Sequence, residues 1–338
     1  MSKKGVLLIN LGTPESFKVK DVRKYLREFL MDKYVIDIPF FNRWLLVNLI
    51  IAPFRAPKSA KEYKKVWTEK GSPLLTYGLE LEKEIQQTLG NDFFVKMAMR
   101  YQNPSIKHVL KAFRDNHINE ILAIPLYPQY ADATTGSTIE KVNLELKQIA
   151  DYKPSVKFIN YFYHQDFYLQ TFIETAKEQI KDKSFDHFVF SYHGLPERQI
   201  LKSSANCSLN ETCCAGKNKF NEFCYRFQCF ETTRLIANKL NINENNYSVC
   251  FQSRLGKQEW IKPYTEQVIK ELAQKDIKNI AVFAPSFIAD CLETTVEIGE
   301  QYKNLFLELG GESLTLIDSL NNHPVWISNL SEFIQKQC

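Results

Sequence analysis

The stretch VLLINLGTPES (residues 6–16) has a counterpart in FVFSYHGLPER (188–198) in the second half of the chain. Each is an apolar run that leads into Gly-x-Pro-Glu, a pattern typical of a buried strand that ends in a sharp turn. A second pair, LYPQYADATT (126–135) and APSFIADCLETT (284–295), shares an aromatic residue, Ala-Asp and a pair of threonines. Because both pairs occur in the same order, they predict two similar halves, with a boundary near residues 150–165.

Short apolar runs alternate with longer amphipathic segments along the chain. Buried strands are expected at 5–11, 93–99, 120–126, 187–193, 247–253 and 279–285. Helices are expected at 21–32, 72–89, 104–115, 259–275 and 291–309. This alternation predicts an α/β fold with parallel strands. Ligands of such sheets bind beyond the carboxyl ends of the strands, so we expect the site in a cleft between the halves.

The composition excludes several classes of protein. With 44% hydrophobic residues, the chain of 338 residues can bury a large core without disulfides. The formal charge of +4 is too small to indicate nucleic acid. The first sixteen residues lack a small-residue cleavage site, and the apolar stretch 40–54 is too short to span a bilayer. We expect a cytoplasmic protein whose membrane contact, if any, is peripheral, on the inner face of the cell membrane.

His193 stands at the end of a predicted strand. Gly194 and Pro196 follow it and predict a rigid turn that would aim the imidazole away from the strand. An imidazole in that place can accept a proton or ligate a metal, whereas the alternative is a histidine whose hydrogen bonds are satisfied at a strand end.

Carboxylates and apolar side chains mark two further segments. Glu293, Glu297 and Glu300 have the spacing of one helical stripe, which is either a solvated face or a line that holds cations. Residues 35–57 are either an ordinary buried helix or an apolar lip that lies on a membrane or admits an apolar ligand. Trp260 either anchors a helix or walls a flat aromatic ligand.

Five segments in family order, spread over nearly the whole chain, resemble motifs of the ferrochelatase family, whose members insert Fe²⁺ into a porphyrin to complete haem. They are INLGTPES (9–16), YPQYADATTGS (127–137), FSYHGLPER (190–198), FQSRLGKQEWIKPYT (251–265) and FIADCLETTVEIG (287–299). The resemblance implies two Rossmann-like halves, each a parallel sheet flanked by helices, with the active site in the cleft. The expected domains are 1–158, which carries the lip 35–57, and 159–338, which carries a cysteine-rich insertion at 203–229 and whose last helix could pack back on the first half.

The resemblance also implies roles for individual residues. It makes His193 the active-site histidine and Glu293 its partner across the pocket, both in reach of the substrate iron. Glu297 falls on the presumed route of metal or protons, although Gln301 stands where many members carry a further acid. The residues expected to bind the porphyrin are Leu11, Arg55, Tyr63, Ser72, Arg100, Tyr101, Tyr130 and Trp260.

The implied reaction converts protoporphyrin IX and Fe²⁺ to protohaem and releases two protons. The residues leave open whether His193 acts as base, as iron ligand or as both. Hard carboxylates and a borderline imidazole suit Fe²⁺, and Zn²⁺ or Co²⁺ would fit as well. The alternatives are a non-catalytic tetrapyrrole or metal carrier, insertion of iron into coproporphyrin, and insertion of cobalt into a related tetrapyrrole.

Five of the eight cysteines crowd into residues 207–229: Cys207, Cys213, Cys214, Cys224 and Cys229. No C-x₂-C pair is present, and thiolates in this number suit a [2Fe–2S] cluster or a Cys₄ zinc site, with Cys213 or Cys214 as the spare. The resemblance favours the cluster, because certain bacterial ferrochelatases carry cysteines in an insertion at this place. Asp132 occupies the position of the first ligand in animal-type members. We expect a [2Fe–2S] cluster of structural or regulatory purpose, with zinc and free thiols as alternatives.

Overall fold

The computed structural model describes residues 3–204, 207–254, 256 and 258–338. Residues 205 and 206 of the expected insertion, and residues 255 and 257 of the 251–265 motif, lie outside the described residues. The chain divides into two compact units. The first comprises Met1–Tyr127, Asp132–Tyr161 and Pro324–Cys338, and the second comprises Pro128–Ala131 and Phe162–His323.

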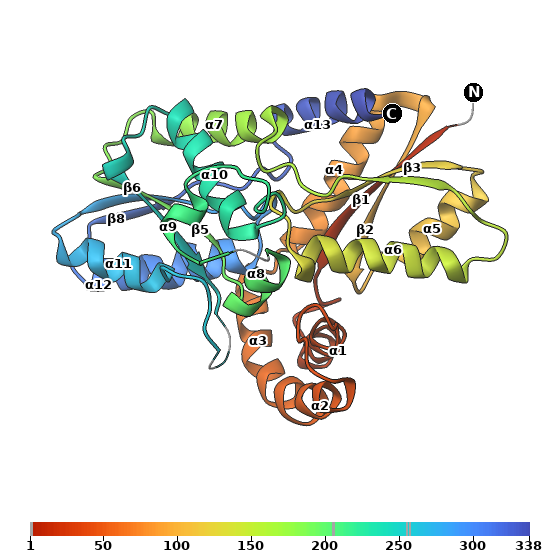
Figure 1. Cartoon of the computed structure of the whole chain (residues 1–338), viewed down its shortest axis with the longest axis horizontal. Coiled ribbons are helices and arrows are strands. Elements are labelled where there is room, and N and C mark those ends of the chain that lie inside the picture. Colours follow the sequence, from red (N-terminus) through yellow and green to blue (C-terminus); the bar gives the residue numbers. More distant parts are fainter. Residues whose placement is uncertain (1–2, 205–206, 255, 257) are drawn as a thin grey trace. The chain divides into compact units, whose positions relative to one another are not determined.

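The first unit is built on a four-stranded parallel sheet (Figure 1). Its central strand β1 (Lys4–Gly12) pairs with β2 (Phe93–Tyr101) and β3 (Glu120–Pro125), and β3 pairs with β4 (Ser155–Phe158) at the edge. Val6, Leu7, Leu8 and Ile9 of β1 are completely buried. An uninterrupted apolar run is what a parallel strand covered on both faces requires.

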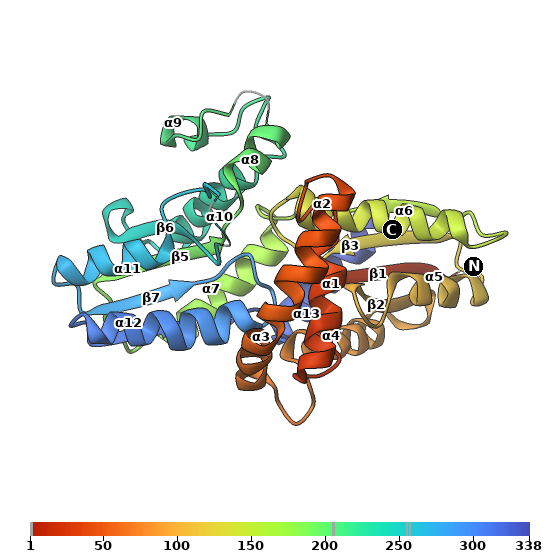
Figure 2. The same ribbon diagram turned by 90° about the horizontal axis from the view of Figure 1, so that it is seen from below.

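Helices cover this sheet and extend beside it. They are α1 (Val19–Leu30), α2 (Phe40–Leu45), the π-helix η1 (Leu46–Ile51), α3 (Ala52–Val66), α4 (Pro73–Leu89), the 3₁₀ turn η2 (Gly90–Asp92), α5 (Ile106–Asp115), the π turn η3 (Asp132–Gly136), α6 (Ser137–Gln148) and α13 (Pro324–Gln337). The last helix, α13, lies beside α4 within this unit (Figure 1). Helices α1 and α3 pack against each other (Figure 2), with Val22, Leu26 and Ala56 in their shared core.

The second unit repeats the arrangement. Its central strand β5 (His187–His193) pairs with β6 (Tyr247–Gln252) and β7 (Asn279–Phe283), and β7 pairs with β8 (Ser313–Leu316). The strand orders β2-β1-β3-β4 and β6-β5-β7-β8 match position by position, so the internal repeat of the sequence corresponds to a repeat of topology. The predicted α/β fold, with two parallel sheets flanked by helices, is confirmed.

The helices of the second unit lie on both faces of its sheet, with α11 and α12 on one face and α7 and α10 on the other (Figure 1). They are α7 (Asp166–Ile180), α8 (Glu197–Ser203), α9 (Glu211–Cys214), α10 (Tyr225–Lys239), the 3₁₀ turn η4 (Glu244–Asn246), α11 (Thr265–Gln274), the π-helix η5 (Leu292–Tyr302) and α12 (Lys303–Glu308).

Two expected helices differ from the structure. The helix expected at 259–275 begins only at Thr265, because backbone atoms before it bond to neighbouring segments: the Ile261 N–H donates to the Leu195 carbonyl, and the Pro263 carbonyl accepts from Phe251. The helix expected at 291–309 is a π-helix as far as Tyr302 and an α-helix only afterwards. Because π-helices are rare and concentrate at functional sites, η5 marks a segment of interest.

The segment 35–57 is helical but is not buried on all sides. Phe40 and Phe41 are each 66% exposed and Phe54 is 79% exposed. Arg43, by contrast, is buried and donates to the carbonyls of Ile36 and Ile38. The observed helices therefore have an apolar outer face, which an ordinary buried helix would lack.

Asp32 is a buried carboxylate that joins three elements of the first unit. Its Oδ2 accepts hydrogen bonds from Arg100 at 2.5 Å, from the Tyr101 hydroxyl at 2.8 Å and from Ser137 at 2.5 Å. The Arg100 side chain is only 12% exposed, so its positive charge is compensated mainly by the Asp32 carboxylate and little by water. The carboxylate thus holds the end of α1 to β2 and to the start of α6.

We predict that Asp32→Ala lowers the free energy of unfolding by about 3 kcal/mol, because it leaves a largely buried guanidinium without its counter-ion. Urea denaturation of the purified protein measures the change. The matched control is Asp115→Ala, which removes a surface carboxylate that pairs with the exposed Arg114 and should cost less than about 0.5 kcal/mol. Equal losses in the two variants would contradict the role given to Asp32.

Candidate active site

His193 is the last residue of the central strand β5 and pairs in register with Gln252, the last residue of β6. Gly194 turns the chain directly after it, and its N–H donates to the Gln252 carbonyl at 2.8 Å. A Cβ on Gly194 would lie 2.8 Å from that carbonyl oxygen and 3.2 Å from the Trp260 ring. Only a glycine therefore permits so close a turn at this strand end.

The turn after His193 is joined to the segment that carries Trp260. The Glu197 N–H donates to the Glu259 carbonyl, and the Ile261 N–H donates to the Leu195 carbonyl. These two bonds hold the Trp260 indole with its ring centre 6.4 Å from that of the His193 imidazole. The structure thus brings together two residues that the sequence singled out separately.

The protonation of the His193 imidazole follows from one contact. Its Nδ1 lies 2.7 Å from the Gly194 carbonyl oxygen. Because a carbonyl oxygen can only accept, Nδ1 carries a proton, and in the neutral form of the imidazole Nε2 then holds the lone pair. Nε2 is the nitrogen that can accept a proton or ligate a metal.

Gln252 connects this strand end to the π-helix η5, which follows β7. Its side-chain amide donates to the Glu293 main-chain carbonyl at 2.9 Å and to the Glu297 carboxylate at 3.0 Å. His193 and Gln252 stand opposite each other at the carboxyl ends of β5 and β6. The histidine and both glutamates are therefore held at the carboxyl ends of the strands.

Glu297 is the most heavily bonded of these groups. Besides Gln252, it accepts from the main-chain N–H of Ser253 at 2.9 Å, from the Ser253 hydroxyl and from the Tyr302 hydroxyl at 3.0 Å. Ser253 has a positive φ of 64°, a backbone conformation that is costly for a residue with a side chain. The Glu297 carboxylate therefore stabilises the strained turn at Ser253. Burial, together with the nearby Glu297 carboxylate, raises the pKa of the Tyr302 hydroxyl.

The N-terminus of η5 is capped by Cys291, whose thiol accepts from the Thr294 N–H while the Thr294 hydroxyl accepts from the Cys291 N–H. Burial, together with contact with Glu293, raises the pKa of the Cys291 thiol well above its usual value. The thiol is therefore protonated and can donate to the Glu293 carboxylate. Asp290, immediately before it, accepts from the Asn321 side-chain amide at 2.8 Å.

In the first unit, the residues expected to bind porphyrin lie in several environments. Arg100 is engaged with Asp32 and Ser137, and Tyr101 is completely buried with its hydroxyl on the same carboxylate. Ser72 is buried and accepts from the Thr13 hydroxyl at 2.8 Å. The remaining expected residues of this unit are Leu11 and Tyr63, both partly exposed, and Arg55, which is exposed.

Tyr130, in the second unit, is fixed to helix α10. Its main-chain N–H donates to the Gln228 side chain at 2.6 Å, and its ring lies edge-on to Phe223, with 5.1 Å between centres. Gln228 is completely buried and also donates to the Glu222 carbonyl. The Gln228 amide thus joins the loop of the 127–137 motif to the cysteine-rich segment.

The five clustered cysteines are reduced thiols in electrostatic contact with one another. Cys207 interacts with Cys213 and Cys224, Cys214 with Cys213 and Cys224, and Cys229 with Cys214 and Cys224. Burial raises the pKa of both Cys207 and Cys214 to about 11. In the described part of the chain, no three His, Cys, Asp or Glu side chains converge closely enough to hold a metal ion.

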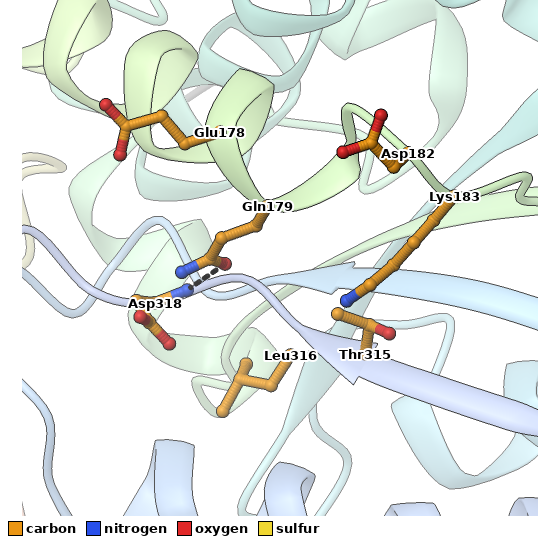
Figure 3. A pocket seen from close by; sticks show the side chains of 7 residues that line it. All are labelled: Glu178, Gln179, Asp182, Lys183, Thr315, Leu316 and Asp318. Atoms are coloured by element: carbon orange, nitrogen blue, oxygen red, sulfur yellow. Dashed lines mark hydrogen bonds between the residues drawn. The ribbon is translucent and has the colours of Figure 1, made fainter.

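A surface hollow of about 400 Å³ lies elsewhere in the second unit, between the end of α7 and the edge strand β8 (Figure 3). Gln179 accepts there from the Asp318 N–H at 3.1 Å, and burial raises the pKa of the Asp318 carboxyl. The lining residues are Glu178, Gln179, Asp182, Lys183, Thr315, Leu316 and Asp318. None of them was expected to be functional, and this hollow is separate from the residues around His193.

Sequence reasoning missed several residues that hold the site together. Gln252 and Ser253 belong to the quoted 251–265 motif, so their presence was visible but their partners were not. Asp32 and Tyr225 carried no signal of their own, because each acts through a hydrogen bond to a residue that is distant in the sequence: Asp32 accepts from Arg100, and the Tyr225 hydroxyl donates to the His193 carbonyl. Tyr302 carried none either, although its partner Glu297 lies only five residues before it on the same helix.

We predict that Glu297→Gln lowers the free energy of unfolding by about 2 kcal/mol, since it weakens charge-assisted hydrogen bonds at the Ser253 turn. Urea denaturation measures the loss. Glu308→Gln on α12 removes an exposed carboxylate of the same size and should change stability by less than about 0.5 kcal/mol. A Glu297→Gln protein as stable as the control would mean that this carboxylate does not support the turn.

Comparison with known proteins agrees with the resemblance of the motifs. The family model described as ferrochelatase matches residues 3–338. A ferrochelatase of Legionella pneumophila is 45% identical over 337 residues, which cover 99% of each chain. A ferrochelatase of Coxiella burnetii is 44% identical over 337 residues, which cover 99% of this chain and 94% of the relative.

A solved structure shares the fold at much lower identity. SirB from Bacillus subtilis, solved with Fe³⁺, is 11% identical, with a TM-score of 0.53 over 99% of this chain and 95% of that one. The likeness supports the two-unit α/β fold. With a family model that covers the chain almost end to end and full-length relatives of 44–45% identity, this chain belongs to the ferrochelatase family.

Proposed function

We propose that this chain is a lyase that inserts Fe²⁺ into protoporphyrin IX to form protohaem, the final step of haem synthesis. Membership of the ferrochelatase family supports the reaction. The observation that carries the site is the arrangement at the carboxyl ends of β5 and β6, where His193 presents Nε2 and Gln252 holds the segment of Glu293 and Glu297.

The reaction requires a proton acceptor. A free-base porphyrin has two pyrrolic N–H groups, and both protons must leave as Fe²⁺ enters. A neutral imidazole with its lone pair on Nε2 can accept such a proton, and a nearby carboxylate stabilises the imidazolium that forms. His193 is therefore proposed as the base, and the same Nε2 could ligate the entering iron.

The two glutamates are proposed to have different roles. Glu297 accepts four hydrogen bonds and remains a fixed anion at the edge of the sheet. The Glu293 carboxylate contacts the Cys291 thiol, a weak donor that a cation or a protonated group displaces easily. Glu293 is thus the carboxylate better suited to receive Fe²⁺ or a proton.

The porphyrin is proposed to contact the side chains that match the family pattern. Trp260 beside His193 offers an aromatic face, and Tyr130 is held firmly by its main chain. Arg55, exposed on α3, suits a propionate. The other residues proposed to bind it are Leu11, Tyr63, Ser72, Arg100 and Tyr101, of which Tyr101 is completely buried and would act through its neighbours.

We also propose that the segment 207–229 binds a [2Fe–2S] cluster through four of its five thiols. The donor set suits the cluster, and the five thiols interact electrostatically with one another. Because no three of these side chains converge on a metal position in the described residues, the proposal requires the segment to close around the cluster as it binds. Arg226, which is buried, donates to the Cys214 sulfur at 2.9 Å and would offset thiolate charge there. Binding requires deprotonation of thiols whose pKa is raised, so affinity should fall as the pH is lowered.

The apolar lip of α2, η1 and α3 is proposed to rest on a membrane surface. No helix in the described residues is long and apolar enough to cross a bilayer. Besides Phe40, Phe41 and Phe54, Leu49 and Ile50 are more than half exposed, and Arg55 and Lys58 are exposed nearby. Apolar side chains rimmed by cations fit the interface of an anionic bilayer.

We predict that His193→Ala lowers kcat for haem formation by at least about 100-fold, as expected for loss of a general base. The assay uses Fe²⁺ and protoporphyrin IX without oxygen. The matched control is His187→Ala at the other end of the same strand, where burial lowers the pKa of the imidazole and its Nε2 contacts Ser248. Unchanged haem formation in His193→Ala would refute the site, and tight binding of porphyrin without any turnover of the wild type would favour the carrier.

For the cluster, we predict about two iron atoms and two sulfides per chain in protein purified without oxygen, with visible absorption. Only one of the variants Cys213→Ala and Cys214→Ala should keep full iron content, since one of this pair is the spare. Cys250→Ala, which removes a buried thiol from β6, is the control and should keep the colour. A colourless, iron-free wild type would refute the cluster, and one zinc per chain would establish the zinc alternative.

For the membrane contact, we predict that the wild-type protein binds vesicles containing anionic phosphatidylglycerol and co-sediments with them on centrifugation. Phe41→Ser with Phe54→Ser should weaken binding at least about tenfold, because each exposed ring contributes apolar burial. The control is Leu307→Ser with Leu309→Ser, two exposed leucines at the C-terminal end of α12, and it should bind as the wild type does. Equal binding of both double variants would exclude the lip as the contact surface.

A further inference from the structure

Tyr225 is the first residue of α10, and its ring is 6% exposed. Its hydroxyl lies 2.8 Å from the main-chain carbonyl oxygen of His193 and 3.1 Å from the Ser286 hydroxyl. A carbonyl can only accept, so the single phenolic proton is donated to His193. The Ser286 hydroxyl must then donate to the phenol oxygen, which fixes the direction of both bonds.

The bond from Tyr225 completes the fixation of one peptide group. The peptide between His193 and Gly194 has two polar atoms: the carbonyl receives the Tyr225 bond, and the N–H donates to the Gln252 carbonyl at 2.8 Å. The Gly194 carbonyl that holds His193 Nδ1 belongs to the next peptide, which is joined to this plane through the two backbone dihedral angles of Gly194. A tilt of the first peptide is therefore passed on to that carbonyl unless the dihedral angles compensate for it. Loss of the phenolic bond would therefore release the plane on which the imidazole tautomer depends.

The same tyrosine contacts the cysteine-rich segment. Cys229 lies one turn further along α10, on the same helix face, and is completely buried. Its thiol and the Tyr225 hydroxyl interact directly. Tyr225 therefore belongs at once to the strand end that carries His193 and to the helix that carries Cys229.

We propose that Tyr225 is a positioning residue that holds the His193 peptide, keeps the imidazole in its Nδ1-protonated form, and connects His193 to the cysteine-rich segment. The importance of this role for catalysis rests on the proposed function of His193, whereas the hydrogen bonds of Tyr225 exist whatever that function is. The tautomer of His193 can therefore be tested separately from the activity.

The experiment compares Tyr225→Phe with the wild type in two measurements. In the first, ¹⁵N NMR of the imidazole reports the tautomer of His193, whose signal is identified by its loss in His193→Ala. We expect the wild type to show the Nδ1-protonated form and the variant to show a mixture with the Nε2-protonated form. In the second, we expect kcat to fall about tenfold with KM for porphyrin changed less than twofold, as loss of one buried hydrogen bond would produce.

The matched control is Tyr152→Phe in the first unit. Tyr152 is also buried, and its hydroxyl also donates to a main-chain carbonyl, that of Ile118, at 2.6 Å. Iron and sulfide content of all proteins is measured in parallel. We expect the control to keep the wild-type tautomer and kcat, whatever its loss of stability, and Tyr225→Phe to keep the wild-type content of iron and sulfide.

An unchanged His193 tautomer in Tyr225→Phe, or an equal change in Tyr152→Phe, would overturn the proposal. If the wild type proved inactive, the proposed function would fail while the NMR result still decided the role of Tyr225. If Tyr225→Phe did not fold, Ser286→Ala would replace it, because it removes the hydroxyl that orients the phenol. This second variant should shift the tautomer partway in the same direction, and no shift would overturn the proposal.

Discussion

The side chain of Gln252 is the constraint on which the candidate site depends. It is 1% exposed and uses all of its polar groups: the amide nitrogen donates to the Glu293 carbonyl and the Glu297 carboxylate, and the amide oxygen accepts from Ser191 at 2.6 Å. A buried amide with every partner satisfied can occupy only one orientation. Because Gln252 also pairs with His193 in the sheet, that orientation sets the π-helix η5 relative to the histidine.

Much of the fold could be predicted from the sequence because buried parallel strands are continuous apolar runs. The runs at 5–11 and 187–193 became the central strands β1 and β5 with nearly the expected bounds. The edge strands β4 and β8 could not be predicted, since each has only four residues: β4 has two exposed and two partly buried positions, and β8 has one buried and three partly buried positions. Such short segments lack the periodicity that separates a strand from a loop.

The candidate site was predictable only in its chemical groups. His193 before Gly194 predicts an imidazole on a tight turn, and the 287–299 motif indicates Glu293 and Glu297 as candidate carboxylates. Their partners are set by tertiary structure: the Ser253 N–H reaches Glu297 across 44 residues, and the Tyr225 hydroxyl reaches the His193 carbonyl across 32. The π-helix was equally hidden, because its residues have the ordinary spacing of an α-helix. Pairings of this kind depend on topology, and a local sequence pattern does not encode them.

The contrast between the two glutamates supports the different roles proposed for them, a fixed charge at Glu297 and an exchangeable ligand at Glu293. Glu297 is held by strong donors, so moving it would forfeit several charge-assisted bonds and release the strained Ser253 turn. Glu293 is positioned through its main chain, which Gln252 holds, while its side chain contacts the Cys291 thiol, a weak donor. A group that must bind and release a cation needs a fixed backbone and a side chain whose partner is easily displaced, and this is why the proposed role of receiving Fe²⁺ falls to Glu293 and not to Glu297.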